Sequence, residues 1–220
     1  MKKNIGKSSL VMAVVLGVST YSNAGVISDQ LFNTGIDIGG NVVASRGGVD
    51  SHWLVDGDTA ITYKHRAYAA NDSDSRWISV NSKGGNETTA STTYTYETTF
   101  DLTGFDASTA SITGLWGADN YGSIFLNGND TGNFLSFGYG AFRSLSHFSI
   151  AEYFIDGINT LSVELTNGHL NPVHDPGPGA LRFDELELQA TAVSEPGTLA
   201  LFSLGLAGLY CSRRKQNKVN

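Results

Sequence analysis

The chain is poor in several residue types, and each shortage argues against a class of protein. One cysteine in 220 residues excludes a disulfide framework and a cysteine-rich zinc site. Charged residues make up only 16% and the formal net charge is −7, which argues against non-specific nucleic-acid binding, because that needs a basic face. Glycine, by contrast, is abundant at 26 residues, as is typical of a turn-rich β protein.

The sequence also lacks the motifs of common active sites. It has no Gly-x-Ser-x-Gly turn, no phosphate-binding loop and no dinucleotide fingerprint. Its five histidines are scattered, and His169, His174 and Asp175 favour a polar loop over a metal site. We therefore expect a protein that is not an enzyme. A secreted hydrolase remains the third reading, and it would need two carboxylates flanking a cleft.

The basic residues that are present gather at the two ends of the chain. Three lysines lie within the first seven residues, an apolar run follows over 10–18, and Ser22-Asn23-Ala24 provides small residues where a signal peptidase would act. This pattern predicts a secretory signal peptide over 1–24, cleaved after Ala24. The alternatives are an uncleaved anchor and a buried helix.

The C-terminal end, 193–220, has the opposite order. A Glu-Pro-Gly sequence is followed by an apolar segment over about 198–212 and then by arginines. A helix over 197–212 would be about 24 Å long, against about 30 Å for a hydrocarbon core, so the arginines would have to reach the headgroups. The sequence predicts a short transmembrane segment with its basic end in the cytoplasm.

This tail resembles the PEP-CTERM sorting tail of Gram-negative bacteria, also labelled the C-terminal domain of ice-binding proteins. The resemblance depends on Glu195-Pro196 before the apolar segment and on Arg213 and Arg214 after it, with Ser194 where the motif usually has proline. It implies transient anchoring in the inner membrane, processing by an exosortase, and delivery to the cell surface or extracellular matrix.

The middle of the chain, 25–192, has no sustained helical period. Alternating or β-branched runs recur between turn residues, and one of them ends in Asn127-Gly128, a strong hairpin signal. The expected strands are 93–100, 111–116, 123–126, 159–165 and 181–188. The pattern predicts an all-β fold, an antiparallel β-sandwich of jelly-roll type, flanked by the signal helix and the transmembrane helix.

Two stretches, 116–128 and 156–168, look like the hairpins of galactose-binding-like jelly rolls. The resemblance spans about 92–190 and implies the fold. It says little about sugar binding, because many such domains bind nothing.

Carbohydrate binding is nonetheless the sharpest ligand hypothesis, since sugars stack on aromatic rings while polar groups hold their hydroxyls. The candidates are Trp116, Asp119, Asn120 and Tyr121. A core position is the alternative for the tryptophan, and a turn is the alternative for the Asp-Asn pair.

Calcium is the one cofactor that the acidic composition favours, because it prefers oxygen ligands. Two acidic turns offer them, through Asp56, Asp58, Asp72 and Asp74. Solvated turns are the alternative.

We therefore expect an exported, non-enzymatic cell-surface or matrix protein. The alternative is a lectin-like module bound to exopolysaccharide, as in a biofilm. An exposed aromatic strip beside polar side chains would favour the lectin-like module, and a cleft with one perturbed carboxylate would favour the hydrolase.

Overall fold

The computed structural model describes residues 24–27, 29–85, 91–138, 140–168 and 177–193, together with 205, 206 and 209. The body of the protein is an all-β fold with one four-residue helix, α1 (Gly140–Arg143). The strands are β1 (Ala24–Val26), β2 (Val49–Val55), β3 (Asp58–Thr62), β4 (Ile78–Ser79), β5 (Thr92–Asp101), β6 (Phe105–Asp119), β7 (Tyr121–Leu126), β8 (Asn129–Leu135), β9 (Ser146–Ile150), β10 (Ile158–Asn167) and β11 (Ala180–Ala192).

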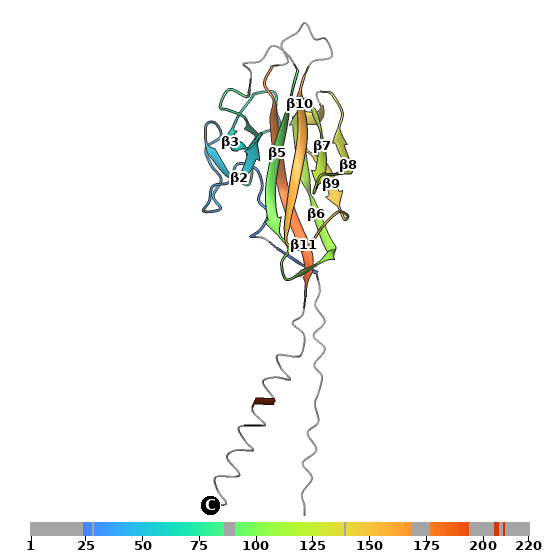
Figure 1. The fold of residues 1–220 in the computed structure, drawn as a ribbon. Helices are drawn as coiled ribbons and strands as arrows, with labels where there is room; N and C mark the ends of the chain where they lie inside the picture. The colour runs from blue at the N-terminus through green and yellow to red at the C-terminus, as the bar shows by residue number, and fades with distance from the viewer. Residues whose placement is uncertain are drawn as a thin grey trace, which may run out of the picture.

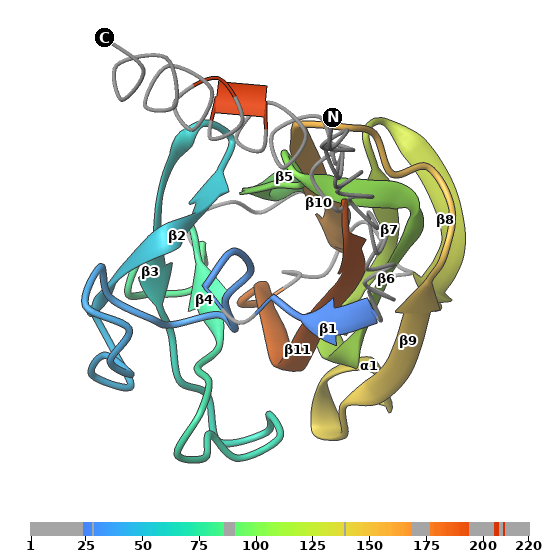
Figure 2. The same ribbon diagram turned by 90° about the horizontal axis from the view of Figure 1, so that it is seen from below.

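The strands form one antiparallel sheet that folds over on itself. Its order is β8-β7-β10-β5-β2-β3-β4-β11-β6-β9, and β1 pairs with β11. Figure 2 shows the β5-β10-β7 half opposite the β11-β6 half, with β8 and β9 side by side where the two ends meet. There the Asn133 side chain donates to the Ser149 carbonyl at 3.0 Å. The result is a two-layered sandwich (Figure 1).

The core lies between the two layers and follows the two-residue period of the strands. In β10, Leu161, Val163 and Leu165 are fully buried while the residues between them are not. From the other layer, Trp116 stacks on Phe183 with ring centroids 6.1 Å apart. Each such side chain stabilises the fold by about 1.5–3 kcal/mol on burial, so this cluster supplies the main driving force for folding.

Tight turns join neighbouring strands at positions that the residue types explain. Asn127 and Gly128 join β7 to β8 with φ of 51° and 77°, the left-handed pair that a two-residue hairpin requires. Asp56 and Gly57 join β2 to β3 in the same way, with φ of 49° and 84°. Few residues other than glycine, asparagine and aspartate adopt these angles without strain.

A buried cation fastens the loop before β4 to β11. The Arg182 guanidinium, 2% exposed, donates to the carboxylates of Asp72 and Asp184 and to the Ala70 carbonyl, while its Nε lies 2.6 Å from the Ser75 hydroxyl. A buried charge needs such partners to offset its lost hydration. The acidic turn 71–74 is thus a structural anchor for the loop.

The expected all-β fold and its central strands are confirmed, since all five predicted runs lie within β5, β6, β7, β10 and β11. Within the described residues no helix is long and apolar enough to cross a membrane. Residues 1–23 of the predicted signal segment and nearly all of the predicted transmembrane segment lie outside them. Ala24, the predicted cleavage position, is the first residue of β1 and pairs with Thr191.

Candidate functional site

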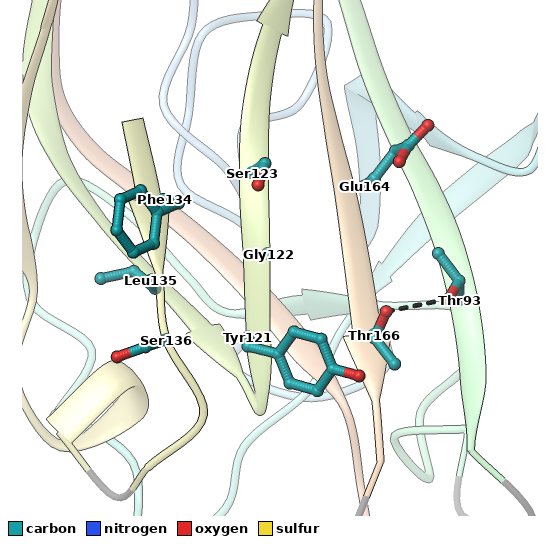
Figure 3. A pocket seen from close by; sticks show the side chains of 9 residues that line it. All are labelled: Thr93, Tyr121, Gly122, Ser123, Phe134, Leu135, Ser136, Glu164 and Thr166. Carbon is teal, nitrogen blue, oxygen red and sulfur yellow. Dashed lines mark hydrogen bonds between the residues drawn. The ribbon is translucent and has the colours of Figure 1, made fainter. Parts of the chain in front are cut away.

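A groove of about 360 Å³ crosses the outer face of the sheet where β8, β7, β10 and β5 lie side by side. Figure 3 shows the rings of Phe134 and Tyr121 and the side chains of Glu164, Thr93 and Thr166 around it. The backbone of β7 at Gly122 lies at its floor. The volume lies within the range of small-molecule sites, about 300–1,000 Å³.

Strand register brings the lining residues together from distant parts of the chain. Side chains directly opposite one another in neighbouring strands share a face. One row across the sheet consists of Tyr121, Thr166 and Thr93. The next row consists of Phe134, Ser123, Glu164 and Thr95. The groove therefore has aromatic rings toward β8 and hydroxyl and carboxylate groups toward β5.

The aromatic side of the groove is exposed, which is unusual for rings of this size. Phe134 is 69% exposed and Tyr121 is 37% exposed. A second hollow of about 260 Å³ shares Phe134 with the groove and continues to Phe137, whose ring lies edge-on to Tyr121 at 6.1 Å. Exposed apolar rings grouped beside polar side chains mark a binding surface more often than a solvated one.

The polar side is partly fixed within the protein. The hydroxyls of Thr93 and Thr166 are hydrogen-bonded to each other at 2.8 Å (Figure 3). Each hydroxyl retains further lone pairs for a ligand. Glu164 adds two carboxylate oxygens on the exposed face of β10.

The structure places only one of the four predicted ligand-binding residues in the groove, namely Tyr121. Trp116 is 1% exposed and belongs to the core, so the expectation that it binds a ligand is corrected, because its strand position faces inward. Asn120 uses its side-chain oxygen to accept from the Gly168 amide at 2.7 Å and its amide to donate to Asp119 at 2.8 Å. It shapes the turn that presents Tyr121.

Asp119 is buried beneath this turn and faces an aromatic cluster. Its Oδ2 accepts from the Tyr68 hydroxyl at 2.7 Å. Burial raises the pKa of Asp119 to about 6, and the bond from Tyr68 opposes part of that rise. Burial, together with the charge of Asp119, raises the pKa of Tyr68 well above its usual value. The predicted pair of Asp119 and Asn120 therefore supports the turn before Tyr121 and does not line the groove.

The acidic turns do not assemble a metal site in the part of the chain that the structure describes, where no three His, Cys, Asp or Glu side chains converge. Asp72 is held by Arg182 and by the amides of Asp74 and Ser75. Burial would raise its pKa, but those hydrogen bonds and the Arg182 charge lower it to about 2. Asp56 accepts from the Thr95 amide at 2.8 Å in its hairpin turn, and Asp58 begins β3.

Sequence reasoning missed Phe134 and Glu164. Phe134 follows a run of polar residues in β8, and Glu164 occupies the outward position of an alternating strand. A large aromatic in an otherwise polar strand was the available signal for Phe134. Nothing local indicated that Glu164 would lie in the row next to Tyr121.

Comparisons with known proteins identify the tail and give related structures. Residues 192–215 match the PEP-CTERM protein-sorting motif, which confirms the resemblance, although Ser194, Glu195, Pro196, Arg213 and Arg214 lie outside the described residues. No curated protein matches the chain.

Among solved structures, a CBM35 from Paenibacillus barcinonensis is similar at 13% identity and a TM-score of 0.34, over 66% of this chain and 94% of that one. A β-glucosidase from Kluyveromyces marxianus is similar at 13% identity and a TM-score of 0.33, over 80% of this chain and 20% of that one. A GH31 α-xylosidase from Xanthomonas citri is similar at 12% identity and a TM-score of 0.28, over 77% of this chain and 17% of that one. The chain thus spans about a fifth of each glycosidase.

Proposed function

We propose that this is an exported, non-enzymatic protein of the cell surface or extracellular matrix that binds carbohydrate in the groove between Tyr121 and Phe134. The PEP-CTERM motif at 192–215 supports export, anchoring in the inner membrane and processing by an exosortase. In this proposal the groove is the binding site, and its ligand is exopolysaccharide outside the cell.

The observation that carries this proposal is the pairing of exposed rings with a polar wall. A pyranose ring has an apolar face of C–H groups and an edge of hydroxyls. Phe134 and Tyr121 can stack against such a face, while Glu164, Ser123 and the threonines accept or donate hydrogen bonds at its edge.

The titratable groups support a binding role over a hydrolase. Among the described residues, the carboxyls whose pKa values are raised are Asp50, Asp119 and Asp184. All three are buried and hydrogen-bonded within the fold. Glycoside hydrolysis needs two carboxylates on either side of the bond, and the groove offers one, Glu164.

The test uses the full chain, purified in a detergent without a sugar headgroup, on a polysaccharide and glycan array with and without calcium. We expect binding to at least one neutral or amino-sugar glycan. Tyr121→Ala and Phe134→Ala should each weaken it about tenfold, the loss expected for one aromatic stacking contact. Tyr153→Ala is the matched control, because Tyr153 is exposed but does not line the groove.

Equal losses in the control and the groove variants would refute the site. Silence across the array would refute carbohydrate binding and leave a structural matrix protein. Binding that requires calcium would show that the acidic loops contribute a cation after all.

A further inference from the structure

The groove has a pronounced charge bias. The four strands that form its face, β5, β7, β8 and β10, carry four acidic residues and no lysine, arginine or histidine. The acidic residues are Glu97, Asp101, Asp130 and Glu164. A surface that recognises acidic sugars needs a cation opposite the carboxylate or sulfate, and the residues of these four strands provide none.

Glu164 lies where this bias would act on a ligand. It is exposed, it lines the groove, and its direct cross-strand neighbours are Ser123 in β7 and Thr95 in β5. Both neighbours are small hydroxyl residues, so the carboxylate is flanked by hydrogen-bonding groups without a neutralising charge. It lies on the opposite side of β7 from the Phe134 ring (Figure 3).

A sugar stacked on Phe134 or Tyr121 would therefore place its ring substituents beside this carboxylate. An ammonium group there would gain an ion pair, a hydroxyl or N-acetyl group would gain a hydrogen bond, and a uronate would meet a like charge. Exposed charge pairs are worth up to about 1 kcal/mol, which corresponds to roughly a fivefold change in affinity.

We propose that the groove discriminates among glycans by charge, accepting amino-sugar chains before neutral ones and excluding uronates, and that Glu164 is the specificity-determining residue. This inference rests on the proposed carbohydrate binding and names its substrate class. It predicts that the ranking of ligands depends on the single side chain of Glu164. An effect of the net charge of the protein would not depend on one residue in this way.

The test compares ligands that share a backbone and differ in charge. The probes are the chitosan and chitin hexamers, and dextran with its amino and carboxymethyl derivatives, titrated onto the full chain in the same detergent. We expect the amino form to bind roughly fivefold more tightly than its neutral counterpart, and carboxymethyl dextran to bind at least fivefold more weakly than dextran. Added salt should reduce both differences.

Two variants separate a local effect of Glu164 from the net charge. Glu164→Gln keeps the size and a hydrogen-bonding oxygen of the side chain, and it should remove most of both differences when each charged ligand is compared with its neutral counterpart on the same variant. Glu97→Gln removes the same charge from β5, outside the groove lining, and should leave the ranking unchanged.

The outcomes distinguish this inference from the function on which it rests. If none of these probes binds while the array identifies another glycan, the inference fails and carbohydrate binding stands, whereas silence of both the probes and the array refutes both. If neutral and carboxymethyl chains bind equally, or if both variants change the ranking alike, the charge selectivity at Glu164 is refuted while carbohydrate binding stands.

Discussion

Asp119 should make the stability of the domain depend on pH in a direction opposite to that of most carboxylates. The Tyr68 hydroxyl lies 2.7 Å from Asp119 Oδ2 and 3.0 Å from the Pro178 carbonyl oxygen. A hydroxyl has one proton to donate, so ionised Asp119 competes with Pro178 for it. Protonated Asp119 donates to Tyr68, which then donates to Pro178, and every group is satisfied.

The magnitude follows from the pKa. Burial raises the pKa of Asp119 from 3.8 to about 6, which corresponds to about 3 kcal/mol at 1.36 kcal/mol per pH unit. Because the folded state holds this proton more tightly than the unfolded state, the stabilisation is complete below about pH 4 and is lost as the pH rises through about 6.

Asp119→Asn isolates this contribution. The asparagine amide can donate to the Tyr68 hydroxyl as the protonated acid does, but it does not titrate. The free energy of unfolding of the variant, minus that of wild type, should rise by about 3 kcal/mol between pH 4 and pH 7. The assay is urea unfolding of residues 24–193, which contain the whole described core, at several pH values.

Asp101→Asn provides a control of opposite sign. Hydrogen bonds from Thr103 lower the pKa of the half-buried Asp101, so its stabilisation is present at neutral pH and is lost as the pH falls. The variant minus wild-type difference should therefore fall with rising pH. A difference for Asp119→Asn that stays constant from pH 4 to pH 7 would refute the reasoning about the buried carboxyl.

Two further predictions concern buried polar networks. Arg182→Met should lower the free energy of unfolding by about 3–5 kcal/mol, because it leaves the carboxylates of Asp72 and Asp184 side by side without their cation. Urea unfolding measures this loss. Recovery of stability when Asp72→Asn and Asp184→Asn are combined with Arg182→Met would confirm the cause. Asn159→Ala should cost about 2–4 kcal/mol, because the buried Asn159 side chain holds the loop before β10 through bonds to Ile155, Gly157 and Asn127. A melting temperature within 2 °C of wild type would contradict it.

The parts of the fold that the sequence predicted are those encoded locally. The strand over 159–165 alternates apolar and polar residues. Asn127-Gly128 specifies the turn between β7 and β8, because both residues adopt positive φ angles. The same signal was present at Asp56-Gly57, whose turn joins β2 to β3. There the acidic residues suggested a calcium ligand, with a solvated turn as the alternative, and the hairpin itself was not predicted.

The candidate site was only partly predictable, because register and not spacing assembles it. Tyr121 was a candidate because its aromatic ring can stack on a sugar. Glu164 reaches the row next to it only because β10 pairs with β7 in one particular register, and a shift of one residue would turn Glu164 inward. Asp72 likewise has a carboxylate that could bind calcium, but this carboxylate forms an ion pair with Arg182, which lies 110 residues away in the sequence.

The groove lies toward the end of the sandwich opposite Ala192, the residue at which the sorting motif begins. Asp119, two residues before Tyr121, pairs with Ala180 at the start of β11, whereas Ala192, where the sorting motif begins, ends the same strand. Thirteen residues of strand span about 40 Å, close to the full height of the domain (Figure 1). A chain held at a membrane through its tail would therefore present the groove at its far end, where polysaccharide outside the cell can reach it. This separation lets the tail be anchored or cleaved without altering the groove.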